Sequence, residues 1–188
     1  MRLILASQSL LRKRAFDILG LKCETIPSNF DESLIKDANP HQRTKKLAEA
    51  KALTVGVKHP DSLVVAGDLF AVMDHKVYEK PKDLKEAERM LKAFSGKEHE
   101  VISGIAVYNS KTKKMLSTSK MCKVKFRVIN SFEIKDYISR YPVLRFAAAF
   151  DGDGLLRFAE RIDGSYNFAT GLPMPELILF LRLNGVKV

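Results

Sequence analysis

Among the charged residues, Asp68 has the sequence context that most strongly indicates a catalytic or ligand-binding role. It follows the small and apolar run VVAG at 64–67, which predicts a short buried strand with a carboxylate at its end. In open α/β sheets the ligand crevice lies beyond the carboxyl ends of the strands. A carboxylate there is costly to bury unless a metal, a cation or a hydrogen bond compensates. Because Lys80 and Pro81 follow shortly afterwards, we expect phosphate and metal chemistry here.

A second candidate site is the polar loop Ser7-Gln8-Ser9, which joins an apolar strand to a helix over 10–19. This geometry aims backbone N–H groups and hydroxyls at an anion. Arg12 lies in the first helical turn, where a cation opposes the helix dipole. That small penalty makes sense if an anion normally binds there. Capping of the helix explains the two serines about equally well.

The other charged candidates carry less information by themselves. Glu32 in the loop FDES and Lys51 on a predicted helix would each usually be solvated charges. DGDG at 151–154 lacks the later ligands of a calcium loop, so a turn is favoured. The four histidines show no spacing typical of a zinc site.

Composition predicts a soluble globular protein in one domain, 1–188, with anionic partners. Hydrophobic residues make up 46% and charged residues 29% of the 188 residues, and the formal net charge is +10. Most lysines are scattered, which favours a solvated surface. Cys23 and Cys122 lack the spacing of a metal or redox motif, so we expect free thiols in a reducing compartment. No signal peptide and no membrane span is evident, and the cytoplasm is the expected location.

Strands alternate with helices along the chain, and two long strands lie in the middle. The patterns predict strands over 3–6, 23–27, 63–67, 99–109, 115–129 and 155–162, a hairpin over 70–78, and helices over 10–19, 40–55, 83–95, 131–140 and 176–183. Long neighbouring strands within an α/β pattern favour a mixed twisted sheet with flanking helices. Two lobes around a cleft would follow from such a sheet.

Eight segments, read in order, resemble the Maf family of nucleoside triphosphate pyrophosphatases. Each is weak alone, but their order and spacing match from end to end. They are LILASQSLLRKRAFDIL at 3–19, FDES at 30–33, LAEAKA at 47–52, VVAGD at 64–68, EKPKD at 79–83, SGKEHEV at 95–101, VKFR at 124–127 and GSYNFATGLP at 164–173.

The resemblance implies a deep cleft in a mixed α/β fold similar to that of inosine triphosphate pyrophosphatases. It also implies hydrolysis of a nucleoside triphosphate to the monophosphate and pyrophosphate with Mg²⁺ or Mn²⁺. By position it assigns Asp68 as proton acceptor, Glu32 and Asp68 as the metal-side acids, and Ser7, Ser9, Arg12, Lys51 and Lys80 as substrate-binding residues. Whether Asp68 is a base or a metal ligand stays open.

Three departures from the family pattern concern the choice of base. Leu11 replaces the first arginine of the usual SPRR, Leu69 replaces a threonine after the aspartate, and Asp153 replaces a glutamine of one large branch. Those three family residues are associated with a preference for dTTP and UTP. We therefore expect a shift toward purine or modified bases, with Asp153 accepting hydrogen bonds from a guanine-like base.

Two alternatives remain at this level: a non-catalytic binding or regulatory protein, and another phosphohydrolase of the same fold, such as an inosine triphosphate pyrophosphatase. The family has also been linked to septum inhibition in bacteria, and the basic surface suits a nucleic-acid-binding or septum-regulating protein without catalysis. No aromatic RNA-binding motif, GXXG loop or concentrated basic helix supports nucleic-acid binding. The apolar helices near the chain ends fit a homodimer interface or a core equally well.

Overall fold

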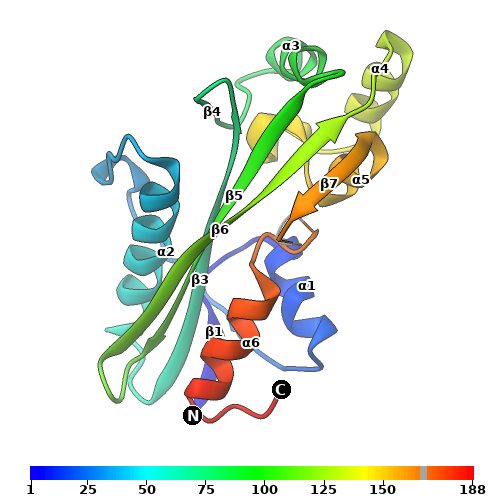
Figure 1. Cartoon of the computed structure of the whole chain (residues 1–188). Helices are drawn as coiled ribbons and strands as arrows, with labels where there is room; N and C mark the ends of the chain where they lie inside the picture. Colours follow the sequence, from blue (N-terminus) through cyan, green and yellow to red (C-terminus); the bar gives the residue numbers. More distant parts are fainter. Residues whose placement is uncertain (166–168) are drawn as a thin grey trace.

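A mixed β-sheet forms the centre of the molecule (Figure 1). The structure is a computed structural model, and it describes residues 1–165 and 169–188. The strands are β1 (Arg2–Leu5), β2 (Glu24–Thr25), β3 (Ser62–Met73), β4 (Lys76–Tyr78), β5 (Glu98–Asn109), β6 (Lys114–Phe126) and β7 (Ala159–Gly164). Their order is β2-β1-β3-β5-β6-β7, and β4 pairs with β3. β1 is parallel to β2 and β3, whereas the other pairs are antiparallel. The predicted mixed α/β class is confirmed.

Helices cover both faces of the sheet at one end and gather around its other end (Figure 1). The helices are α1 (Leu10–Ile18), α2 (Pro40–Gly56), α3 (Leu84–Phe94), α4 (Ser131–Arg140), α5 (Gly152–Phe158) and α6 (Met174–Leu183), and the short 3₁₀ turns are η1 (Glu32–Leu34), η2 (Val143–Arg145) and η3 (Ala147–Ala149). Along β3, Val64 and Ala66 belong to the core cluster of α2, whereas Leu63 and Val65 belong to that of α1 and α6. This alternation follows from the two-residue period of a strand. No helix in the described ranges has both the length and the apolar character that a membrane crossing requires.

Asp68 lies inside a long strand, so its predicted position at a strand end is wrong. β5 pairs with β3 from Leu63 to Val72, and Asp68 is opposite Gly104. On the other edge, β1 pairs with β3 only up to Val65, and β4 pairs with it only from Ala71. In the part of the chain that the structure describes, β3 therefore has no strand beside it around Asp68 on that edge. This gap is where the cavity opens.

The turn predicted at 151–154 is wrong, and the strand predicted over 155–162 begins only at Ala159, as β7. Asp151 caps α5, because its Oδ1 accepts a hydrogen bond from Gly154 N at 2.9 Å. Leu155 and Phe158, three residues apart, are buried on one side of this short helix. A short apolar run suits either element, and here the cap and the core contacts favour the helix.

The remaining predicted strands differ from the structure mainly in length. The strand expected over 23–27 reduces to Glu24–Thr25, and β6 ends at Phe126 rather than near residue 129. The predicted hairpin turn at Asp74 and His75 is present, and both residues have positive φ. The two cysteines are free, as predicted.

Gly104 lets α2 approach the sheet opposite Asp68. A Cβ at this position would lie 2.3 Å from the carbonyl oxygen of Thr44 on α2. Real Cβ atoms do not come that close to backbone, so any larger residue would push the helix outward. The close approach keeps Lys51, which is also on α2, against β3.

His99 is buried among aromatic rings away from the cavity. Its ring lies 4.5 Å from the ring of Phe126 and 4.8 Å from that of Phe94, centroid to centroid. Burial lowers the pKa of His99 to about 4, because the charged imidazolium loses its hydration. The folded protein therefore holds this histidine neutral.

We expect His99 to make the protein sensitive to acid. The unfolded chain binds more protons than the folded chain between pH 4 and 6.5, so the free energy of unfolding falls as the pH falls through this window. Between pH 7 and pH 4.5, His99→Phe should reduce that loss by about 2 kcal/mol. Urea unfolding at pH 7 and at pH 4.5 measures it, with the exposed His75→Asn as control. An equal loss in His99→Phe and in the wild type would refute this expectation.

Candidate active site

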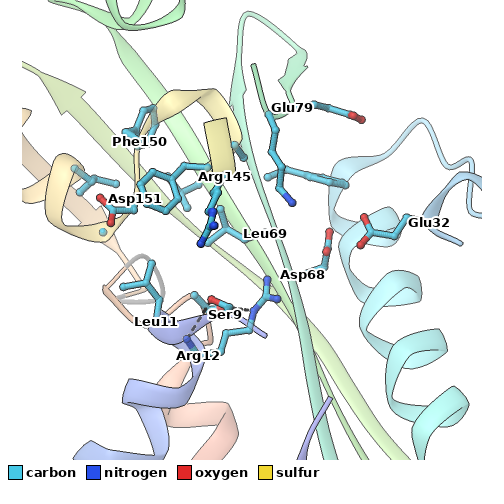
Figure 2. Close-up of a pocket in the computed structure, with 18 of the residues that line it drawn as sticks. Ser9, Leu11, Arg12, Glu32, Asp68, Leu69, Glu79, Arg145, Phe150 and Asp151 are labelled. Atoms are coloured by element: carbon cyan, nitrogen blue, oxygen red, sulfur yellow. Dashed lines mark hydrogen bonds between the residues drawn. The ribbon is translucent and has the colours of Figure 1, made fainter. Parts of the chain in front are cut away.

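A cavity of about 520 Å³ opens beside the unpaired edge of β3 (Figure 2). Its walls come from α1, α2, β3, the loop after β4 and the segment around η2 and η3. Most residues predicted for the site line it: Ser9, Leu11, Arg12, Glu32, Lys51, Asp68, Leu69 and Lys80. Segments far apart in the sequence thus meet at one place. Ser7 is buried directly behind this wall.

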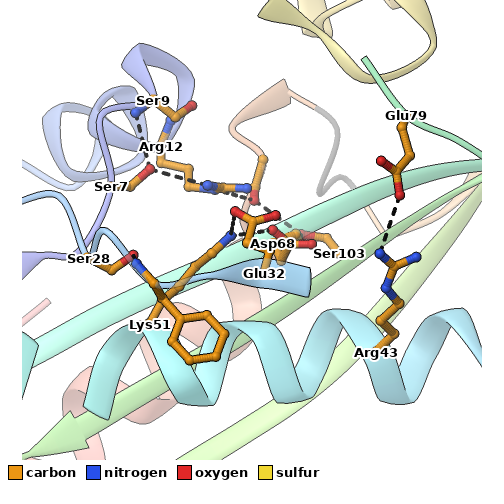
Figure 3. Close-up of polar contacts among 12 residues, drawn as sticks. Ser7, Ser9, Arg12, Ser28, Glu32, Arg43, Lys51, Asp68, Glu79 and Ser103 are labelled. Atoms are coloured by element: carbon orange, nitrogen blue, oxygen red, sulfur yellow. Dashed lines mark hydrogen bonds and ion pairs between the residues drawn. The ribbon is translucent and has the colours of Figure 1, made fainter. Parts of the chain in front are cut away.

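Lys51 holds two carboxylates at the floor of the cavity (Figure 3). Its Nζ lies 2.6 Å from Asp68 Oδ1 and 2.8 Å from Glu32 Oε1. Lys51 and Asp68 are 7% and 6% exposed, whereas the Glu32 side chain remains about half exposed. The buried ammonium of Lys51 and the carboxylate of Asp68 compensate each other's charge, and burial of either group without the other would be costly. The remaining oxygen, Asp68 Oδ2, is buried and has no hydrogen-bond partner among the described residues.

The two carboxylates have different proton affinities. Burial raises the pKa of Asp68 above its ordinary value, although the charges of Lys51 and Arg12 and the hydrogen bond from Lys51 oppose this. Burial also acts to raise the pKa of Glu32, but the hydrogen bond and charge of Lys51, with the charges of Lys80 and Arg12, outweigh it and lower that pKa. Asp68 is therefore the better proton acceptor, while Glu32 stays ionised.

The serine loop orients Arg12. Ser9 Oγ accepts a hydrogen bond from Arg12 N at 3.4 Å and caps α1. Ser7 Oγ accepts hydrogen bonds from Ser9 N at 3.1 Å and from Arg12 Nη1 at 3.2 Å. Arg12 Nε donates to the carbonyl oxygen of Gly171 at 3.4 Å. The serines thus both cap the helix and orient the guanidinium, so the two explanations suggested by the sequence are compatible.

Arg12 has no carboxylate in contact with it within the described ranges. Burial lowers the pKa of Arg12, although the charges of Asp68 and Glu32 act in the opposite direction. Lys80, on the loop after β4, also makes no ion pair with any described residue. The cavity therefore presents cations whose charge remains available to an anionic ligand.

The three residues expected to influence base choice are not all on the wall. Leu11 and Leu69 line the cavity. Asp153 does not line it, and its carboxylate lies 3.7 Å from Arg14 Nη1 on the exposed surface of α5. The acid of this segment on the wall is Asp151, which caps α5. Part of the motif at 164–173, residues 166–168, lies outside the described residues.

The sequence did not point to Arg43, Glu79 or Arg145. Arg43 Nη2 lies 3.3 Å from Glu79 Oε1, and the Arg43 guanidinium lies 4.9 Å from the ring centre of Phe70 (Figure 3). This pair links α2 to the loop that carries Lys80. Arg145 reaches the cavity from η2. Glu79 lies in the segment EKPKD but received no role, and Arg43 and Arg145 lie in none of the family-like segments. The tertiary fold brings all three to the site.

The residues on the floor fit a divalent cation bound together with a phosphate ligand. Mg²⁺ is usually held by one or two carboxylates plus substrate phosphates. Glu32 and Asp68 supply two carboxylates near one point, and Asp68 Oδ2 is an unpartnered acceptor. No cluster of three or more His, Cys, Asp or Glu side chains suited to a metal occurs among residues 1–165 and 169–188. The arrangement thus suits a metal that reaches the site with its ligand.

Comparison with known proteins gives relatives over almost the whole chain. The family described as "Maf: Maf-like protein" matches residues 2–183. Proteins named dTTP/UTP pyrophosphatase from Clostridium botulinum and Aquifex aeolicus are 38% and 35% identical, and the alignments cover 99% and 97% of this chain and 98% and 95% of theirs.

Among solved structures, the Ham1 protein of Staphylococcus aureus has a TM-score of 0.54 at 13% identity, covering 98% of this chain and 100% of that chain. A HAM1 protein from Coxiella burnetii has a TM-score of 0.52 at 15% identity, covering 97% and 99%. At such identities the likeness concerns the fold alone. The family match and the relatives above 30% identity extend over the residues that build the cavity. This chain belongs to the Maf-like protein family.

Proposed function

We propose that this protein hydrolyses a nucleoside triphosphate to the monophosphate and pyrophosphate in the cavity beside Asp68. The observation that carries the proposal is the combination of a buried, partly unpartnered carboxylate with cations that have no acid partner among the described residues. A polyphosphate needs its negative charge offset before a nucleophile can approach. The names of the relatives, dTTP/UTP pyrophosphatase, support the same reaction class.

Each residue would have a distinct role in this reaction. Arg12 and Lys80 would bind the phosphates through charge-assisted hydrogen bonds. Asp68, with its raised pKa, would accept the proton of the attacking water. Lys51 would keep the two carboxylates in place. Glu32 and Asp68 would hold Mg²⁺ or Mn²⁺, which supplies additional charge neutralisation at the phosphates.

The base preference of this protein should differ from that in its relatives' names. Leu11 and Leu69 present apolar surface to the cavity, and a larger purine ring buries more apolar area than a pyrimidine. Because Asp153 lies on the outer surface, its expected role in reading a guanine-like base stays a prediction. We therefore expect purine or modified triphosphates to be hydrolysed at least as well as dTTP and UTP.

Pyrophosphate release tests both the reaction and the base preference. Purified protein is assayed against dTTP, UTP, CTP, GTP, ITP and 7-methyl-GTP with Mg²⁺, with Mn²⁺ and with EDTA. We expect release of pyrophosphate and monophosphate that EDTA abolishes. A clear dTTP and UTP preference would reject the expected base shift only. No release from any triphosphate would reject the enzyme, and tight DNA or RNA binding would then favour the nucleic-acid-binding alternative.

The proposal also includes the cellular location and the oligomeric state of the enzyme. A cytoplasmic location accords with two free cysteines and with a nucleotide substrate. A homodimer remains compatible with the exposed apolar residues Leu10, Val128 and Phe132. Light scattering at several protein concentrations would decide the oligomeric state.

A further inference from the structure

Arg145 is a cation of the cavity to which the resemblance assigns no role. It lines the cavity, and Figure 2 shows its side chain extending into the cavity with the guanidinium beside Leu69. The side chain makes no hydrogen bond and no ion pair with any residue that the structure describes. An arginine without a partner is ordinary on a convex surface, but Arg145, although exposed, lines an open cavity that would receive an anion.

The balance of charge on the cavity wall depends on this residue. Two of the lining cations, Lys51 and Arg43, contact carboxylates. The lining cations without a carboxylate in contact, within the described chain, are Arg12, Lys80 and Arg145. A nucleoside triphosphate carries several negative charges, and each of these three cations can offset part of that charge when it binds.

The backbone that carries Arg145 is fixed and strained. The next turn places Ala148 and Ala149 at φ 55° and 66°, in the left-handed region that L-residues rarely adopt, and both side chains are fully buried. Ala148 N donates a hydrogen bond at 3.1 Å to the carbonyl oxygen of Glu79, the neighbour of Lys80. The Glu79 carboxylate in turn pairs with Arg43 on α2. A hydrogen bond therefore links the segment that carries Arg145 to the segment that carries Lys80, and an ion pair links the latter to α2.

The position of Arg145 within the cavity indicates which part of a ligand it meets. Figure 2 shows it between the charged floor at Asp68 and the side where Leu11 and Phe150 lie. An uncharged base suits the apolar side, whereas the phosphates suit the charged floor. The ribose and the first phosphate lie between these two parts of the ligand, and of the two only the phosphate carries a charge that a guanidinium can bind.

We propose that Arg145 binds the phosphate adjacent to the nucleoside, as a substrate-binding residue of the pyrophosphatase site. This rests on the proposed function for the identity of the ligand. The guanidinium can donate two parallel hydrogen bonds to phosphate oxygens, which an ammonium cannot reproduce. The residue thereby contributes to recognition of the monophosphate part of the substrate and of the monophosphate product.

Product inhibition separates this role from a general effect of charge. In Arg145→Ala we expect the inhibition constant of the nucleoside monophosphate and the KM of the triphosphate to rise about 10- to 100-fold. Inhibition by pyrophosphate should stay as in the wild type, because Arg145 does not contact that part. Arg145→Lys should recover only part of the loss. Arg140→Ala, which removes an exposed arginine paired with Asp136 on α4, is the matched control and should change neither constant.

Each outcome decides the inference. Equal monophosphate inhibition in Arg145→Ala and the wild type would overturn it while leaving the pyrophosphatase intact. Equal weakening of monophosphate and pyrophosphate inhibition would show a non-specific charge effect and also overturn it. If the wild type hydrolyses no triphosphate, the proposed function fails. Calorimetric titration of both proteins with nucleoside monophosphate then still tests Arg145, and binding that is absent or equal in the two would reject it.

Discussion

Asp68→Asn should abolish most of the activity while leaving the protein as stable as the wild type or more stable. The amide cannot accept the proton of the attacking water, so we expect kcat to fall by roughly 10²- to 10⁴-fold. Asparagine is nearly isosteric with aspartate and can still accept a hydrogen bond from Lys51, whose charge Glu32 continues to compensate. The fold should therefore persist.

The stability part of this prediction follows from proton linkage. The folded state raises the pKa of Asp68, mainly by burial, so folded protein binds more protons than unfolded protein above the ordinary pKa of 3.8. The free energy of unfolding that this group contributes therefore falls as the pH rises through the folded pKa. At neutral pH the ionised Asp68 is a cost, and the amide removes it. Such a trade between stability and activity is common at active sites.

Steady-state rates and thermal unfolding at pH 7.5 measure both effects. The exposed Asp163→Asn, which weakens an ion pair with Arg161 at the far edge of the sheet, serves as the control and should change neither quantity much. A rate for Asp68→Asn within a few-fold of the wild type would mean that Asp68 is not the proton acceptor. A marked loss of stability would mean that the charge of Asp68 is needed for folding.

Lys51→Met should lose both stability and activity, whereas Asp68→Asn should lose activity alone. Lys51 is 7% exposed and contacts two carboxylates, so its removal leaves two acids close together without a cation. Breaking a buried pair in this way costs about 3 to 5 kcal/mol. Because Lys51 lowers the pKa of Asp68, its loss should raise that pKa further and move the acid limb of the rate profile to higher pH.

The same variant gives a test of the metal site without an activity assay. Two carboxylates freed from Lys51 should bind Mg²⁺ or Mn²⁺ more tightly, so added metal should raise the unfolding temperature of Lys51→Met more than that of the wild type. Lys46 is on the same helix as Lys51 and makes an exposed ion pair with Asp37, which precedes that helix. Lys46→Met should cost no more than about 1 kcal/mol and show no metal effect. An unfolding temperature of Lys51→Met that does not respond to metal would contradict the proposed ligands.

The sequence predicted many of the residues that line the cavity, but not the geometry of the cavity. The order of the segments around Asp68, Lys51 and Lys80 was enough to gather them in one cavity. The continuation of β3 past Asp68 depends on pairing with β5, and such contacts between distant segments leave no local pattern. For the same reason the sequence missed Arg145.

Short apolar runs also limit how well the sequence predicts secondary structure. The run after DGDG fits a strand or a helix by periodicity alone, and the cap at Asp151 decides for α5. That difference turns Asp153 away from the cavity and toward Arg14. A role assigned to a residue by motif position therefore depended on an element that the motif did not specify.

A crystal structure with Mg²⁺ and a triphosphate analogue that cannot be cleaved between the first two phosphates tests the central claim most directly. We expect the phosphates to contact Arg12 and Lys80, with a water molecule hydrogen-bonded to Asp68 and facing the phosphorus next to the nucleoside. An analogue bound elsewhere, or one bound in the cavity with Asp68 out of reach of any water beside the phosphates, would contradict the account.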